Sequence, residues 1–139
     1  MPIALSYVVT LIVFLVIDAL WLGTMSEKIY RPLLGDILMD GFRKGPAIAF
    51  YLIYAAGILI FAVVPALKEG SWNTALLWGA LFGFFAYATY DLTNYATLRN
   101  WGLTITLIDL AWGTFVTAIG ATIAYFVASW LLRSFNMSL

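Results

Sequence analysis

The amino-acid sequence predicts an all-α fold, a bundle of four transmembrane helices with a short amphipathic segment at the membrane interface between the first two. Hydrophobic residues make up 64% of the 139 residues and charged residues only 10%, against about half and about a quarter in soluble domains. Four apolar runs reach the length of about 20 residues that a helix needs to cross a hydrocarbon core of about 30 Å. We therefore expect a single integral membrane domain over residues 1–139, in contact with the lipid bilayer.

The four runs have recognisable ends. The first has neither the basic start nor the small-residue cleavage site of a signal peptide, so we expect it to remain as a helix. Gly45-Pro46 places a proline in the first turn of the second helix, and Pro65 is expected to end that helix. Gly70 and a turn centred near Asn100 separate the later helices. The predicted helices cover about 3–22, 46–64, 73–98 and 103–132.

The connection from Gly23 to Gly45 carries apolar residues at roughly helical spacing. Thr24 and Glu27 fit a capping box at the start of a helix. We expect a short amphipathic segment that lies in the membrane interface, interrupted near Pro32 and Gly35. Two interpretations stay open: a connector that lies flat because it is apolar, or a lid or gate toward lipid. The apolar residues are Ile29, Leu33, Leu34, Ile37, Leu38 and Phe42.

The basic residues near the helix ends predict the orientation in the membrane. Five lie in the connection between the first two helices or in the turn between the last two, and two lie at the opposite helix ends. Because Lys and Arg are enriched in cytoplasmic loops, we expect a multi-pass protein of the bacterial inner membrane with both termini outside. The five are Lys28, Arg31, Arg43, Lys44 and Arg99, and the two are Lys68 and Arg133.

The composition excludes several kinds of chemistry. The chain has no histidine and no cysteine, which removes imidazole and thiolate metal sites, cysteine nucleophiles and Ser-His-Asp catalysis. The net charge is zero, so nothing favours a nucleic-acid partner. We expect no cofactor and no bound metal, and the expected partners besides lipid are a small-molecule or lipid ligand.

Three aspartates, Asp18, Asp91 and Asp109, lie inside the predicted helices, and no lysine or arginine lies inside any of them. A charged side chain at the bilayer centre costs about 2.5–3.5 kcal/mol on insertion scales. Intramembrane acids are therefore candidate site residues. The alternative is that each lies at a helix end near the interface, where its charge costs little.

The spacing of polar residues around the last turn predicts a shared seam. Asp91 and Asp109 each lie nine residues from Asn100, and Asn94 and Thr106 each lie six from it. Residues three apart share a helix face, so two polar stripes are expected to face each other at equal depth. The alternative makes Thr106-x-x-Asp109 a capping box of a helix that starts late.

Two helices carry the same short motif, Asp18-x-x-Trp21 in the first and Asp109-x-x-Trp112 in the fourth. The spacing places an indole beside each acid on one helix face. An indole donates its N–H to a carboxylate or offers its π face to a cation. The alternative is a pair of tryptophans in the aromatic belt at the interface.

Small residues predict how the helices pack. Gly79 and Gly83 lie four apart in the third helix, and the fourth helix carries a stripe of small residues. Such stripes let helices approach closely in lipid. We expect this contact within one chain, and a homodimer is the alternative. The stripe comprises Gly113, Thr117, Gly120, Ala121 and Ala124.

A longer motif carries a family resemblance. The segment Thr89-Tyr90-Asp91-Leu92-Thr93-Asn94, with Asp18-x-x-Trp21 before it and Asp109-x-x-Trp112-Gly113 after it, resembles a family of small bacterial integral membrane proteins classed as a domain of unknown function. The resemblance covers essentially the whole chain. It implies a stand-alone four-helix protein in which the three aspartates are motif residues, and it implies no activity.

The function expected from these residues is a proton- or cation-responsive site that binds or transports a small molecule, near the cytoplasmic side. One alternative is a membrane-embedded enzyme that modifies a lipid through an acid–base pair or an aspartate-bound Mg²⁺. Another is a structural or assembly partner whose acids join helices by hydrogen bonds. Tyr87 enters the site because it lies one turn before Asp91. The predicted site residues are Asp18, Asp91, Asp109, Asn94, Trp21, Trp112, Tyr87 and Thr106.

Overall fold

The computed structural model describes residues 1–139 and contains helices without strands. Four continuous helical stretches are long and apolar enough to cross a membrane, which confirms the predicted fold class. They are Pro2–Ile37, Lys44–Glu69, Trp72–Thr97 and Leu103–Ser134. Their elements are α1 (Pro2–Met25), the π-helix η1 (Ser26–Tyr30), α2 (Arg31–Leu34), the 3₁₀-helix η2 (Gly35–Ile37), α3 (Lys44–Ile58), the π-helix η3 (Leu59–Val63), α4 (Val64–Glu69), α5 (Trp72–Thr97) and α6 (Leu103–Ser134).

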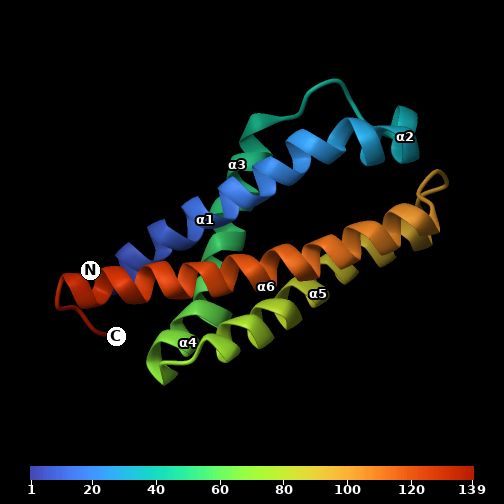
Figure 1. Ribbon diagram of the computed structural model, residues 1–139. Coiled ribbons are helices and arrows are strands. Elements are labelled where there is room, and N and C mark those ends of the chain that lie inside the picture. Colours follow the sequence, from blue (N-terminus) through green and yellow to red (C-terminus); the bar gives the residue numbers. More distant parts are fainter.

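The helices are arranged around α6. Helices α5 and α6 form an antiparallel hairpin, α1 packs along α6, and α3 packs against α1 (Figure 1). Both chain termini lie at one end of the bundle, called here the terminal end. The α1–α3 connection and the α5–α6 turn lie at the opposite end, called the loop end (Figure 1). An even number of spans places both termini on the same side.

Glycines allow the closest helix contact, between α5 and α6. A Cβ added to Gly79 would lie 2.9 Å from the Cβ of Ala121, and one added to Gly83 would lie 2.5 Å from the carbonyl oxygen of Gly113. Real Cβ atoms do not approach other atoms so closely, so only glycine fits at either position. The small residues therefore serve a contact within one chain, as predicted. The surrounding core includes Phe14, Ile58, Val63 and Val116, all fully buried.

The second membrane-spanning helix continues beyond Pro65, so the prediction that Pro65 ends it was wrong. Proline has no N–H to donate to the preceding turn. The π-helix η3 precedes it, and the N–H of Val64 bonds to the carbonyl of Leu59. This wider turn shifts the hydrogen-bond register just before the proline, so the chain stays helical. The helix ends at Glu69, before Gly70 in the left-handed region.

The first connection also differs from its prediction. Helix α1 continues through η1 and α2 to η2 without a break, so the predicted capping box at Thr24 and Glu27 was wrong. Thr24 lies inside α1 and its hydroxyl donates to the carbonyl of Leu20. The amphipathic segment instead packs its apolar side on the α5–α6 turn, where Leu34 and Trp101 are buried together. The segment covers the loop end of the bundle.

Candidate functional site

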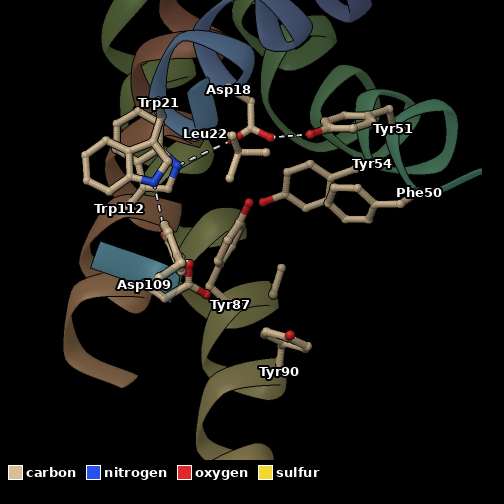
Figure 2. Close-up of a pocket in the computed structure, with 12 residues that line it drawn as sticks. Asp18, Trp21, Leu22, Phe50, Tyr51, Tyr54, Tyr87, Tyr90, Asp109 and Trp112 are labelled. Carbon is tan, nitrogen blue, oxygen red and sulfur yellow. Dashed lines mark hydrogen bonds between the residues drawn. The ribbon is translucent and has the colours of Figure 1, made fainter. Parts of the chain in front are cut away.

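A pocket of about 420 Å³ lies in the loop-end half of the bundle (Figure 2). Twelve residues from α1, η1, α3, α5 and α6 line it, and eight of them are aromatic. Two are aspartates, and none is a lysine or arginine. The lining residues are Asp18, Trp21, Leu22, Tyr30, Phe50, Tyr51, Tyr54, Ala86, Tyr87, Tyr90, Asp109 and Trp112.

Asp18 lies at the junction of three helices. Its side chain is buried. The Tyr51 hydroxyl on α3 donates to its Oδ2 at 2.5 Å, and the Trp112 indole on α6 donates to its Oδ1 at 3.4 Å (Figure 2). Both donors are neutral, so they satisfy the carboxylate oxygens without cancelling a negative charge.

Asp109 is held by a chain of two donors. The Tyr30 hydroxyl donates to its Oδ1 at 2.8 Å, and the Trp21 indole donates to the Tyr30 oxygen at 2.9 Å. Tyr30 is the last residue of the π-helix η1, and such wide turns occur frequently at functional sites. The amphipathic segment thus contributes a side chain to the pocket.

The two indoles cross between the helices. Trp21 and Trp112 stack with ring centroids 4.0 Å apart and planes 9° apart. Trp112 bonds to Asp18 and Trp21 reaches Asp109 through a tyrosine, so the prediction that each indole lies beside its own acid was wrong. The reason is that α1 and α6 run antiparallel. The two Asp-x-x-Trp motifs then point in opposite directions, and each acid lies level with the other helix's indole.

Asp91 lies behind the pocket, beside Asp109. It is fully buried, and neither of its oxygens has a hydrogen-bond donor nearby. Asp109 on the facing helix is its neighbouring acid, and no hydrogen bond joins the two carboxyls. Two adjacent buried carboxyls cannot both be ionised cheaply. No basic side chain bonds to either one: the salt bridge of the chain, Arg31 with Glu27, is at the surface.

Tyr87 lines the pocket, as predicted. Its ring lies against Gly113, where a Cβ would overlap the ring atoms. Asn94 and Thr106 do not line it. Thr106 is buried within α6, not at its start, and its hydroxyl donates to the carbonyl of Gly102. The capping-box alternative for Thr106 is therefore wrong, because the helix begins at Leu103.

Seven lining residues were not among the predicted site residues, and five of these are aromatic: Tyr30, Phe50, Tyr51, Tyr54 and Tyr90. A signal existed for two of them. Tyr51 and Tyr54 lie three apart in an apolar helix, and a hydroxyl in hydrocarbon needs a partner inside the protein. Tyr51 finds Asp18, and Tyr54 bonds to Thr117 at 2.8 Å.

The three aspartates do not converge on one point. No group of three or more acidic side chains is arranged to hold a metal ion. Asp18 and Asp109 face the pocket from different helices, and Asp91 lies outside it.

Comparison with known proteins gives one family. The sequence profile described as "Predicted membrane protein (DUF2177)" matches residues 3–126. The match includes every residue that lines the pocket. No curated protein and no solved structure matches the chain.

Proposed function

The chain belongs to this family of membrane proteins of unknown function, and we propose that it binds a small organic cation in the aromatic pocket, at a site that responds to protons. One observation carries the proposal. Two buried aspartates face a ligand-sized pocket in which every hydrogen-bond donor is neutral. A cation in the pocket would supply the positive charge that the protein itself does not place there.

The rest of the lining also suits a cation. Aromatic faces attract ammonium groups, especially where water is excluded. The two indoles cover one face of each other by stacking. Six further aromatic rings line the pocket: Tyr30, Phe50, Tyr51, Tyr54, Tyr87 and Tyr90. The volume of about 420 Å³ falls within the range of about 300–1,000 Å³ for small-molecule sites.

The Asp91–Asp109 pair supplies the response to protons. Two adjacent buried carboxyls without a basic partner cost least when they share one proton. A cation that binds beside Asp109 would favour its ionised form and the release of that proton. Exchange of a proton for a cation is the step on which coupled transport is built, and it serves equally in a pH-dependent receptor.

The same proposal includes an orientation in the bacterial inner membrane. All five basic residues of the first connection and the third turn lie at the loop end, and both termini lie at the other. Because basic residues favour the cytoplasm, the pocket would open near the cytoplasmic side with both termini outside. A C-terminal reporter that is active only in the cytoplasm should stay dark, and a bright signal would reverse the orientation.

Equilibrium binding tests the proposal. The protein in nanodiscs should bind tetraethylammonium more tightly at pH 8 than at pH 6, and Asp18→Asn should weaken that binding by at least about tenfold because it removes a charge facing the ligand. Asp36→Asn is the matched control, since this acid lies in η2 outside the pocket. Equal binding by wild type and Asp18→Asn, or no binding at either pH, would overturn it.

A further inference from the structure

We propose that the ligand is an alkylammonium, a cation with an apolar chain and no phosphate, and that it enters the pocket sideways from the bilayer between α3 and α5. This inference rests on the proposed function, because it names the class of cation and its route. Three features support it: the divergence of α3 from α5, the aromatic rim at their fork, and the absence of basic residues from the pocket.

The two helices touch at one level and then separate. Tyr54 on α3 stacks on Phe82 of α5 with ring centroids 5.2 Å apart, and a Cβ added to Gly57 would lie 2.5 Å from the Phe82 ring. Toward the loop end α3 stays against α1 while α5 stays against α6, so the helices diverge (Figure 1). The pocket occupies this fork.

The rim of the fork is aromatic and exposed. Phe50 on α3 is 43% exposed and Tyr90 on α5 is 55% exposed, and both line the pocket. Phe50 lies six residues after Lys44, the first residue of α3, and Tyr90 lies seven before Thr97, the last residue of α5. At 1.5 Å per residue the rim is about 9–10 Å inside the helix ends. With the helix ends at the outer edge of the headgroups, which add about 5–8 Å to each side of the hydrocarbon core, this depth lies among the lipid chains.

Side chains bound the pocket on two other sides. The stacked indoles of Trp21 and Trp112 lie between α1 and α6, while Leu22 on α1 lines the pocket and is partly exposed. Tyr30 covers the loop end, and the amphipathic segment that carries it packs on the α5–α6 turn. The fork has aromatic lining residues on both of its helices, and it is the route that we assign to a ligand that comes from the bilayer.

The charges select the class of ligand. An ammonium head meets Asp18 and Asp109, and an apolar chain passes between Phe50 and Tyr90 into lipid. A phosphate would meet two carboxyls and no lysine or arginine in the pocket, and a buried anion without a partner is costly. An alkylammonium is thus favoured over a zwitterionic phospholipid.

Two probes with the same head test the inference. Dodecyltrimethylammonium should bind to the protein in phosphatidylglycerol nanodiscs at least about tenfold more tightly than tetramethylammonium, after correction for partition into empty discs, because buried methylenes contribute about 0.8 kcal/mol each. Discs of phosphatidylethanolamine should not suppress that binding. Suppression by the host lipid would show that the site takes a phospholipid, and the inference would be wrong.

A closed fork tests the route. The chain has no cysteine, so Phe50→Cys with Tyr90→Cys can be bridged by a bifunctional thiol reagent, and the unbridged double variant is the matched control. Bridging should abolish binding of dodecyltrimethylammonium and leave tetramethylammonium bound. Equal affinity for both probes, or an equal effect of the bridge on both, would overturn the lateral route while the proposed function stands. If neither probe binds the wild-type protein, the proposed function itself fails.

Discussion

The two halves of the α5–α6 hairpin differ in what lies between and around the helices. Toward the terminal end, Gly79 packs so closely against Ala121 that there is no room for a side chain at Gly79. Toward the loop end, Tyr87 and Asp109 point from the two helices into a pocket. Close packing is what stabilises helix association in lipid, whereas buried acids oppose it. The comparison teaches that one half of the hairpin stabilises the fold and the other carries the chemistry.

The largest expected effect comes from breaking the close-packed half. Gly83→Val should destabilise the protein strongly, because its Cβ would meet the Gly113 carbonyl oxygen at 2.5 Å and the Thr117 side chain at 2.7 Å. Overpacking typically costs about 1–3 kcal/mol and more against backbone. Thermal unfolding in detergent measures it. Gly23→Ala is the control, since nothing lies within 4 Å of its Cβ; equal melting temperatures for both variants would contradict the comparison.

A substitution at the boundary should affect both halves. Gly113→Ala would push the Tyr87 ring away from α6 and into the pocket. The ring can rotate, so we expect a folded protein that loses about 1–3 kcal/mol of stability and also binds tetraethylammonium more weakly. Unfolding and binding are measured on the same sample. Unchanged binding with reduced stability would mean that Tyr87 has no part in the site.

A smaller effect is expected from Tyr51→Phe, which removes the hydroxyl that bonds to Asp18 at 2.5 Å. Hydrogen bonds to charged groups contribute about 1.5–3 kcal/mol, and the remaining Trp112 donor limits the loss to the lower part of that range. If Asp18 only joins helices, binding should not change. If it serves a ligand, the freed carboxylate should change the affinity for tetraethylammonium, and titration decides between the two.

The smallest change in stability is expected from Asp91→Asn. Asparagine keeps the shape of the side chain, and its NH₂ group can donate to Asp109 even when neither position carries a protonated carboxyl. The variant should therefore be as stable as the wild type, or more stable, at pH 7–8, and its binding of tetraethylammonium should no longer depend on pH. Strong and equal destabilisation at pH 5 and pH 8 would indicate an ionised, structurally paired Asp91 and would favour an assembly role.

Local geometry accounts for what could be predicted from the sequence. Hydropathy places four helices, and a short turn at Asn100 fixes Asp91 and Asp109 at one depth, because helix rise per residue is constant. Pro65 was misjudged because a π-turn can shift the hydrogen-bond register before a proline. That compensation depends on the residues of the preceding turn and not on the proline.

Contacts between distant segments account for the features that could not be predicted from the sequence. Tyr30 lies outside the apolar runs, and only the packing of its segment on the α5–α6 turn brings it to Asp109. The crossing of Trp21 and Trp112 follows from the antiparallel order of the first and fourth helices. That order was already implied by four successive spans, so this part of the site could have been predicted.

The most direct test of the central claim is a count of protons released when the cation binds. Nanodiscs carrying the protein, in weak buffer near neutral pH with a pH indicator, are titrated with tetraethylammonium. We predict release of about one proton for each cation bound, because the Asp91–Asp109 pair shares one, and no release from Asp91→Asn. Binding to wild type without a change in pH would contradict the coupling between the pocket and the buried pair.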